Sequence, residues 1–315
     1  PPVAFSTESP LAWSRVVSAS FVPLVADELG DGPFHASIRG RAVDGVFLSR
    51  IRASAHEVHR TPSLIDASER LFYKLMLVVE GAGELEQDER VARMAAGSLS
   101  VYDTSRPYRL TFPRGTDAIV VMLPRDMVEP SPAHMQTLTA MTLPGDDSLT
   151  RLVAPFLAEL ASDFHALEGP SATRVVRTAV DLISTLLSQA ALEHGGDQRH
   201  LALTLRIREH IIQNLADPGL GPESIARASY VSTRHLHELF REQGTTVSTW
   251  IRDRRIAAIR DQLADPLQAD RSIGEIATAY GYPDPSHFSR TFRQVVGVSP
   301  RAFRAHAIQR RPAER

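Results

Sequence analysis

The sequence has no cysteine among its 315 residues and a single lysine, Lys74, because arginine supplies the other 34 of its 35 basic residues. The absence of cysteine excludes disulfide bonds, thiolate metal sites and cysteine nucleophiles. It agrees with an intracellular, cytoplasmic location, which we expect. The shortage of lysine can follow from coding composition, so by itself it assigns no function.

Long hydrophobic runs are lacking too. No apolar run approaches the roughly 18 residues of a membrane-spanning helix, and the sequence does not open on a charged and then apolar leader. We therefore expect no membrane partner. The hydrophobic share of 43% and the charged share of 23% are ordinary for a folded protein. A chain of 315 residues is longer than the chains that usually fold around a single hydrophobic core, so we expect two domains.

The net charge of −2 hides an asymmetry between the two parts of the chain. Residues 199–315 sum to +6, whereas residues 1–198 sum to −8. This asymmetry fits a protein of which only the C-terminal part meets a polyanion. Solvated charge on two unrelated faces explains it equally well.

Between about residues 34 and 123, short apolar runs alternate with turn signals. Regularly spaced short strands are typical of a β-sandwich or a small barrel, and residues 11–29 suggest a helix ahead of it. The clearest strand runs are residues 46–48, 73–79, 98–102 and 118–123, and the turns lie at residues 80–83, 96–98 and 113–115.

The periodicity of the next segment is helical. One helix covers about residues 149–160, with Asp147 or Ser148 as its N-cap, and a second covers about residues 175–190. Both are amphipathic. They either pack on each other and on the barrel or form the contact of a homodimer, and the sequence leaves both readings open.

Internal repetition is the strongest feature of the chain, and it lies in the basic part. Ile225-Ala226-Arg227-Ala228 recurs 51 residues later as Ile276-Ala277-Thr278-Ala279. Each copy leads through a turn with an apolar residue, Val231 or Tyr282, into a second apolar-striped segment. A helix, a tight turn and a second helix form the helix-turn-helix motif.

The second helix of each unit carries polar residues on its outer face, which could enter the major groove of double-stranded DNA. Arg can donate two hydrogen bonds to guanine, Glu can accept one from cytosine, and Ser or Thr can pair either way. The predicted base readers are Ser232, Thr233, Arg234, His237 and Glu238 in the first unit and Asp284, Ser286, His287, Ser289 and Arg290 in the second, with Arg241 and Arg293 one turn further on for phosphate contacts.

A single helix is expected between the two units, from Ser248 to about Leu263. It could hold the two reading helices about one DNA turn, roughly 34 Å, apart. One monomer would then read two successive segments of the major groove. The inward positions of this connecting helix are Trp250, Ile251, Ile256, Ile259 and Leu263, and the more outward ones are Arg252, Arg254, Arg255 and Arg260.

These residues resemble the DNA-binding region of the AraC/XylS family of bacterial regulators. The resemblance covers residues 204–304, and it departs from the family pattern at Ile259, at Thr246-Val247 and at the turn Ser229-Tyr230. The residues that carry it are Arg255-Ile256, Leu263, Ile273-Gly274-Glu275-Ile276-Ala277, Tyr280-Gly281-Tyr282, residues 287–293 and Gly297-Val298-Ser299-Pro300.

The N-terminal part is similar to the cupin-like sensor barrels of that family, through residues 59–62, 97–99 and 105–108. The resemblance implies a small-molecule effector, dimerisation and activation of nearby promoters, with RNA polymerase as a partner. The predicted architecture is a two-domain α+β chain. It has a cupin-like β-barrel with an N-terminal helix (1–143), a helical segment (144–194), a linker at residues 194–198, and an all-α domain with two helix-turn-helix units (199–315).

The barrel offers no convincing metal site or cofactor site. His56 and His59 are three apart and would point to opposite faces of a strand, and no Gly-rich phosphate loop or catalytic motif occurs, so we expect no enzyme. An apolar pocket with a few polar groups is expected inside the barrel. Its candidate effector-binding residues are Arg50, His59, Tyr73, Tyr102 and Arg106, although Tyr73 and Tyr102 could equally be plain core.

Two rival functions stay open at this point. One is a metal-dependent cupin enzyme with a DNA-binding tail, which requires bound transition metal and turnover of a substrate. The other is a regulator that a partner protein switches instead of a small molecule. The sequence alone does not separate this second rival from an effector-responsive regulator.

Overall fold

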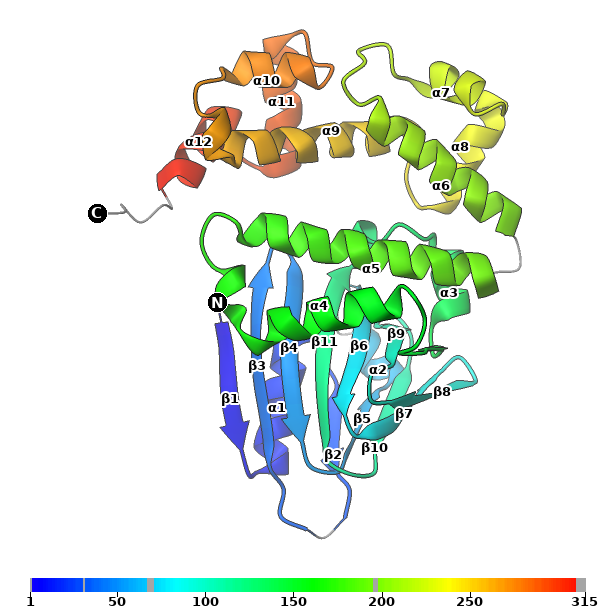
Figure 1. The fold of residues 1–315 in the computed structure, drawn as a ribbon, viewed down its shortest axis with the longest axis vertical. Coiled ribbons are helices and arrows are strands. Elements are labelled where there is room, and N and C mark those ends of the chain that lie inside the picture. The colour runs from blue at the N-terminus through cyan, green and yellow to red at the C-terminus, as the bar shows by residue number, and fades with distance from the viewer. Residues whose placement is uncertain (1, 31, 67–70, 195–197, 310–315) are drawn as a thin grey trace. The chain divides into compact units, whose positions relative to one another are not determined.

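The computed structural model describes residues 2–30, 32–66, 71–194 and 198–309. The chain forms two compact units, Pro1–Gly195 and Gly196–Arg315 (Figure 1). Each unit has its own hydrophobic core and is treated by itself. The expected linker at residues 194–198 falls mostly outside the described residues.

The first unit is built on two antiparallel sheets. The seven-stranded sheet has the order β1 (Pro2–Thr7), β3 (Ala36–Val43), β4 (Val46–Ala53), β11 (Thr116–Pro124), β6 (Phe72–Glu80), β9 (Leu99–Asp103) and β12 (Thr142–Leu143). The five-stranded sheet has the order β2 (Val25–Glu28), β5 (His56–Arg60), β10 (Tyr108–Phe112), β7 (Ala82–Gln87) and β8 (Arg90–Ala95). The predicted fold class is confirmed, with one refinement: the strands form two sheets rather than one closed barrel.

The core of the first unit lies between the two sheets. Met76 and Val120 of the larger sheet meet Leu85 and Leu110 of the smaller one in a single buried cluster. Strand β11 is apolar almost throughout and is buried on both faces, because helices cover the sheet face that turns away from this core. The four strand runs expected from the sequence all fall in β4, β6, β9 and β11.

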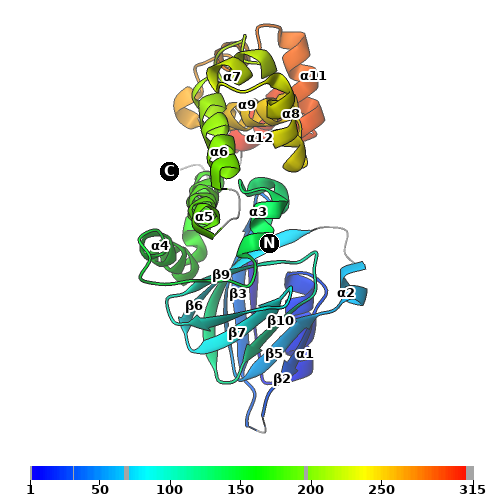
Figure 2. The same cartoon turned by 90° about the vertical axis from the view of Figure 1, so that its right-hand side faces the viewer.

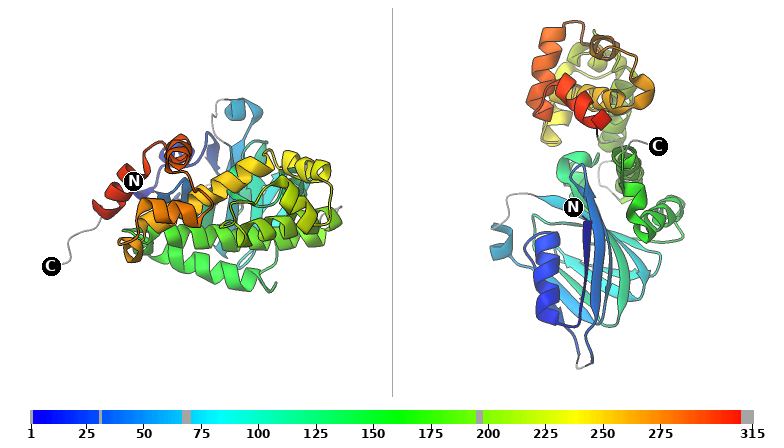
Figure 3. Two further views of the ribbon diagram at one scale, coloured as in Figure 1. Left: turned by 90° about the horizontal axis from the view of Figure 1, so that it is seen from above. Right: turned by 90° about the vertical axis from the view of Figure 1, so that its left-hand side faces the viewer.

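The N-terminal helix is shorter than predicted. Helix α1 (Pro10–Ser20) begins at the cap Ser9, whose side chain accepts a hydrogen bond from the Ala12 amide, and it lies beside the sheets (Figure 3, right). Its Trp13 is buried in a cluster with residues of both sheets. The prediction of a helix to residue 29 is wrong, because Pro23 cannot continue one. The chain instead pairs with β5 as strand β2.

Two longer helices cover the outer face of the larger sheet, α4 (Thr150–Ser162) and α5 (Ala172–His194) (Figure 1). The N-cap of α4 is Leu149 rather than the predicted Asp147 or Ser148, but the Asp147 carboxylate accepts hydrogen bonds from the amides of Leu149 and Thr150 at 3.0 and 3.1 Å, just ahead of the helix. Helix α5 is long and apolar enough to cross a membrane by length and composition. Its apolar stripe, however, packs inside this unit. The shorter helical segments are α2 (Pro62–Asp66), η1 (Arg125–Met127), α3 (Pro132–Leu138) and η2 (Phe164–Leu167).

The second unit is all helical. Its elements are α6 (Gln198–Gln213), α7 (Pro222–Ala228), α8 (Thr233–Glu242), α9 (Val247–Ala264), η3 (Pro266–Gln268), α10 (Ile273–Ala279), α11 (Pro285–Val296) and α12 (Pro300–Gln309). Helix α9 is the expected connecting helix. Its first half, with Trp250 and Ile251, packs with α6, α7 and α8, and its second half, with Ile256 and Ile259, packs with α10 and α11. The two helix-turn-helix units therefore share one central helix.

Candidate nucleic-acid interface and interior cavity

The turns of the two helix-turn-helix units follow the same backbone path. The Val231 amide donates to the Ala226 carbonyl at 3.0 Å, and the Tyr282 amide donates to the Ala277 carbonyl at the same distance. The residue before each donor has a left-handed backbone, with φ of 57° at Tyr230 and 78° at Gly281. The 51-residue repeat of the sequence is thus a repeat of the structure.

The second turn requires glycine for steric reasons as well. A Cβ on Gly281 would lie 2.7 Å from the guanidinium carbon of Arg255. The first turn is open, and Tyr230 stands in the equivalent place with 94% of its surface exposed. The first turn therefore accommodates a side chain, whereas a side chain in the second turn would have to displace the guanidinium of Arg255.

Arg255 lies at the centre of this unit. Its Nε donates to the Leu215 carbonyl at 3.0 Å, and its guanidinium also donates to the Asp217 carbonyl. Burial lowers the pKa of Arg255. The sequence placed this side chain on the outer face of the connecting helix, and that expectation is wrong. It joins the loop before α7 to the turn of the second unit.

The predicted base-reading positions all lie on exposed faces. In α8 the apolar side chains Leu236, Leu239 and Phe240 are buried, and in α11 the rings of Phe288 and Phe292 are buried. Figure 2 looks nearly along α9 and shows α8 and α11 on the same side of it. The exposed residues are Ser232, Thr233, Arg234, His237, Glu238 and Arg241 on α8, and Asp284, Ser286, His287, Ser289, Arg290 and Arg293 on α11.

Some of these side chains already have a structural task. Ser232 caps α8, and Asp284 caps α11 by accepting hydrogen bonds from the Ser286 and His287 amides, which lowers the pKa of Asp284. Arg241 pairs with Glu238 at 3.2 Å. The two caps orient the start of each helix, so Ser232 and Asp284 have a structural role of their own.

A partly open cavity of about 40 Å³ lies between the two sheets of the first unit. Helix α1 and the turn after it provide Val17, Phe21 and Leu24, and both sheets provide the remaining walls. Most of the lining is apolar or aromatic. The polar residues that line it are His56, Lys74, Tyr102, Tyr108 and Thr116.

Of the five residues predicted to bind an effector, the structure places one in this cavity, Tyr102. Tyr73 is buried beneath the guanidinium of Arg125, 5.2 Å from its ring centre. The remaining three lie in ion pairs outside the cavity: Arg50 with Asp117, His59 with Asp27, and Arg106 with Asp88. Lys74 and Tyr108, which the sequence did not single out, line the cavity instead.

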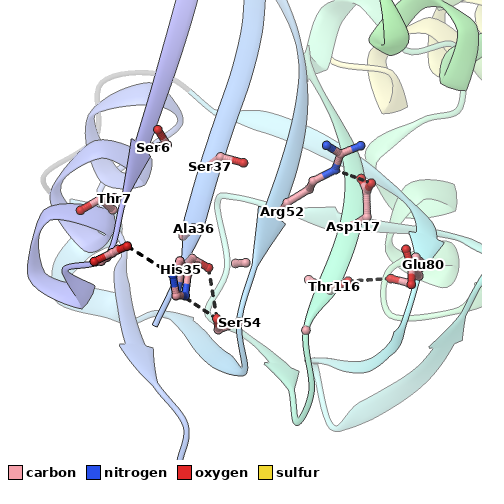
Figure 4. A pocket seen from close by; sticks show the side chains of 13 residues that line it. Ser6, Thr7, His35, Ala36, Ser37, Arg52, Ser54, Glu80, Thr116 and Asp117 are labelled. Atoms are coloured by element: carbon pink, nitrogen blue, oxygen red, sulfur yellow. Dashed lines mark hydrogen bonds and ion pairs between the residues drawn. The ribbon is translucent and has the colours of Figure 1, made fainter. Parts of the chain in front are cut away.

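A wider and more open hollow of about 900 Å³ lies at one end of β1, β3, β4 and β11 (Figure 4). Most of its charged groups pair with one another. Asp117 accepts hydrogen bonds from Arg50 and Arg52, and these bonds hold its pKa below the usual value although burial alone would raise it. His35 faces Glu8 at 3.3 Å. Most of the charged side chains that line this hollow therefore already have a protein partner.

The described residues contain no group of three or more metal-binding side chains. His56 is buried and stacks on Phe112 with ring centres 5.0 Å apart, and burial lowers its pKa. His59 faces Asp27 instead. The two histidines therefore have different surroundings, as their spacing on β5 suggests.

Comparison with known families decides the identity. The AraC-binding-like domain matches residues 13–188, and a helix-turn-helix domain matches residues 225–306. The chain belongs to the AraC family of DNA-binding transcription regulators. This family assignment confirms the resemblance drawn from the sequence.

Two curated relatives extend over most of this AraC-family chain. The transcriptional activator NphR of Rhodococcus sp. is 31% identical over 86% of this chain and 81% of its own length. The transcriptional activator RhrA of Rhizobium meliloti is 26% identical over 96% of both. The crystal structure of the AraC-like transcriptional activator CuxR has a TM-score of 0.53 at 22% identity, covering 88% of this chain and 100% of that one. The likeness to CuxR shows a shared fold alone.

Proposed function

We propose that this regulator is a cytoplasmic, one-component activator that binds promoter DNA through α8 and α11 and responds to a small molecule held between its two sheets. The observation that carries the proposal is the pair of exposed polar helices on one side of α9 (Figure 2). Relatives along most of the chain bear the name transcriptional activator. Activation makes RNA polymerase an expected partner.

The spacing of the two units suits one DNA duplex. Helix α9 has 18 residues, which span about 27 Å at 1.5 Å per residue. Helix-turn-helix units that read successive turns of the major groove from one face are about 34 Å apart. A single chain would thus cover two successive groove segments, and its site need not be palindromic.

A homodimer is part of the proposal. Leu152 on α4 is 58% exposed although it belongs to an amphipathic helix. A single exposed leucine is ordinary on a protein surface, so the proposal rests on the place of α4 and α5 on the outer side of the larger sheet. We propose α4 and α5 as the dimer contact, and we propose the division of the chain at residues 143/144 and 194/199 as its functional organisation.

The first test is binding of the purified full-length protein to the DNA upstream of its own gene and of the neighbouring genes. It is run at about 150 mM salt against scrambled competitor DNA, because non-specific binding is dominated by salt-sensitive phosphate contacts. Protection of one discrete site supports the proposal. Binding without a preferred site, with and without effector candidates, would contradict it.

The proposal also has the first unit act by binding rather than catalysis. The rival function, a metal-dependent cupin enzyme, requires several metal-binding side chains that converge on one site. Elemental analysis of the purified protein separates the two functions. Stoichiometric transition metal together with substrate turnover would favour the enzyme.

A further inference from the structure

The only lysine of the chain lies inside the cavity. Lys74 sits on β6, in the middle of the larger sheet, with 2% of its surface exposed. Its ammonium donates to the Tyr108 hydroxyl at 3.3 Å and lies 4.3 Å from the centre of the Phe21 ring. The rings of Tyr102 and Tyr108 are each 5.8 Å from it. One hydrogen bond and three aromatic faces thus surround this amine.

The surroundings of Lys74 lack the partner that a buried cation normally has. Among the described residues that line the cavity, none is Asp or Glu. The charge that acts on Lys74 is another cation, Arg60, which is 1% exposed and whose Nη2 has no hydrogen-bond partner among the described residues. Burial, and then the charge of Arg60, lowers the pKa of Lys74 to about 7.

A purely structural role would not favour lysine at this position. An unpaired charge in an apolar interior is destabilising, and an apolar side chain of similar length would fill the same space without that penalty. Buried ionisable groups without a protein partner are concentrated at binding and catalytic sites. The cavity therefore supplies an amine and the hydroxyl of Tyr108 within an apolar, aromatic lining.

We infer that Lys74 binds the carboxylate of the effector, and that the effector is a small carboxylic acid with an aromatic or aliphatic body. The carboxylate would pair with the ammonium and accept a hydrogen bond from the Tyr108 hydroxyl. The body would pack among Val17, Met76 and Leu110. This inference rests on the proposed function, since it names the ligand class of the same regulator.

The size of the cavity adds a structural condition. A space of about 40 Å³ holds only a few water-sized molecules. A ligand of the size of benzoate needs a larger space, so the partly buried Phe21 at the end of α1 must move when it enters. Ligand binding is therefore expected to shift the segment that joins α1 to β2.

A nuclear magnetic resonance experiment on the full-length protein tests this directly. Incorporation of ¹⁵N-lysine labels one side-chain amine, because the chain has one lysine. The probes are benzoate, phenylacetate and octanoate, each compared with its neutral amide. We expect at least one acid to shift the titration midpoint of the Lys74 amine upward by more than one pH unit and to raise the melting temperature, while the matching amide does neither.

Two variants separate a role in binding from a role in folding. Lys74→Met is expected to bind the acid at least tenfold more weakly while it still folds and still binds operator DNA. Arg39→Met removes a cation that lies 5.9 Å from the Phe164 ring, on the other face of the sheet from Ile38, and should bind the acid as the wild type does. Unchanged acid affinity in Lys74→Met overturns the inference, as does equal binding of acid and amide.

The outcomes also distinguish this inference from the proposed function. If the wild type binds its operator but none of the three acids, the inference about the ligand fails while the proposed function as a DNA-binding regulator is upheld. If an acid binds at Lys74 but no DNA is bound specifically with or without it, the proposed function fails while the ligand site stands.

Discussion

Lys74 and Tyr230 occupy positions at which another residue type would make the folded protein more stable. Lys74 is a buried cation without a carboxylate partner, and Tyr230 has a left-handed φ of 57° that favours glycine. The two differ in surroundings. Lys74 is enclosed by aromatic rings, whereas the Tyr230 side chain lies in the open, and nothing in the structure explains the choice of tyrosine there.

Replacement of Lys74 by methionine should change how stability depends on pH. Burial lowers the pKa of Lys74 from 10.5 to about 7, so between these values the unfolded chain holds a proton that the folded chain lacks. The destabilisation is complete below pH 7 and fades as pH rises toward 10.5. Lys74→Met should therefore be more stable than the wild type at pH 6, by on the order of 1–4 kcal/mol.

Urea unfolding at pH 6, 7.5 and 9 measures this difference. The advantage of Lys74→Met should shrink steadily over that range, because only the wild type gains stability from losing the proton. Arg39→Met serves as the control and should follow the wild-type profile. Parallel profiles for wild type and Lys74→Met would show that the amine is not held in a low-dielectric site.

Tyr230→Gly should stabilise the second unit. A non-glycine residue in the left-handed region costs roughly 1–2 kcal/mol, and part of this is offset by the greater freedom of glycine in the unfolded chain. We expect a net gain of about 0.5–1 kcal/mol in the free energy of unfolding. Tyr230→Ala removes the ring and keeps the strain, so it should show no comparable gain. Equal gains in both variants would assign the effect to the ring.

At the scale of elements, α9 joins the two helix-turn-helix units and Arg255 fixes it to both. The carbonyls of Leu215 and Asp217 accept from this side chain, and Gly281 packs against it. Loss of a charged donor leaves buried carbonyls without a partner, which costs about 1–3 kcal/mol for each group. We expect Arg255→Met to lower the unfolding free energy of the protein by about 2–4 kcal/mol.

Arg252→Met provides the matched control on the same helix, since Arg252 is only half-buried and pairs with its neighbour Asp253. Its effect should stay below about 1 kcal/mol. Chemical unfolding of both variants, followed by tryptophan fluorescence and circular dichroism, makes the comparison. Similar losses in the two variants would refute the central role of Arg255.

Helix α11 should contain both kinds of DNA contact. Arg290→Ala should weaken binding to the operator by about 1–3 kcal/mol with little effect on random DNA, as expected for an arginine that reads a base. Arg293→Ala should weaken binding to operator and to random DNA by the same factor. It should also lower the salt dependence of binding by the amount expected for the loss of about one phosphate contact. Salt-dependent binding titrations on both DNAs give these values. Equal losses on operator and random DNA for Arg290→Ala would make it a phosphate contact as well.

Some elements could be predicted from the sequence because their signal is local. The runs in β6 and β11 are continuous and apolar, since both faces of these strands are covered. In β7 the apolar Leu85 stands between Glu84 and Glu86, so its strand signal was too weak to single out. The two helix-turn-helix units were visible because the pattern occurs twice.

The surroundings of the cavity and of α9 could not be predicted from the sequence, because they depend on packing between residues that are far apart in the chain. The sequence shows that Lys74 interrupts an apolar run, and this indicates a buried lysine. It does not show that no carboxylate lies nearby, because that depends on which strands pack against Lys74 in the fold. The buried role of Arg255 depends on carbonyl groups about 40 residues away in the chain. Neither arrangement follows from helical or strand periodicity.

At the scale of the whole molecule, the chain consists of a basic helical unit and an acidic sheet-rich unit. Residues 199–315 carry the net positive charge together with both exposed reading helices. The sheets of the other unit enclose an apolar chamber with one amine. This division matches a regulator in which one unit binds DNA and the other binds an effector.

The central claim is that both α8 and α11 read DNA, and guanine methylation interference on the protected site tests it most directly. Methylation of guanine N7 blocks arginine in the major groove. The account predicts two clusters of interfering guanines about 10 base pairs apart on one face of the duplex, with Arg234→Ala and Arg290→Ala each insensitive to one cluster. A single cluster, or weak interference spread along the whole fragment, would contradict it.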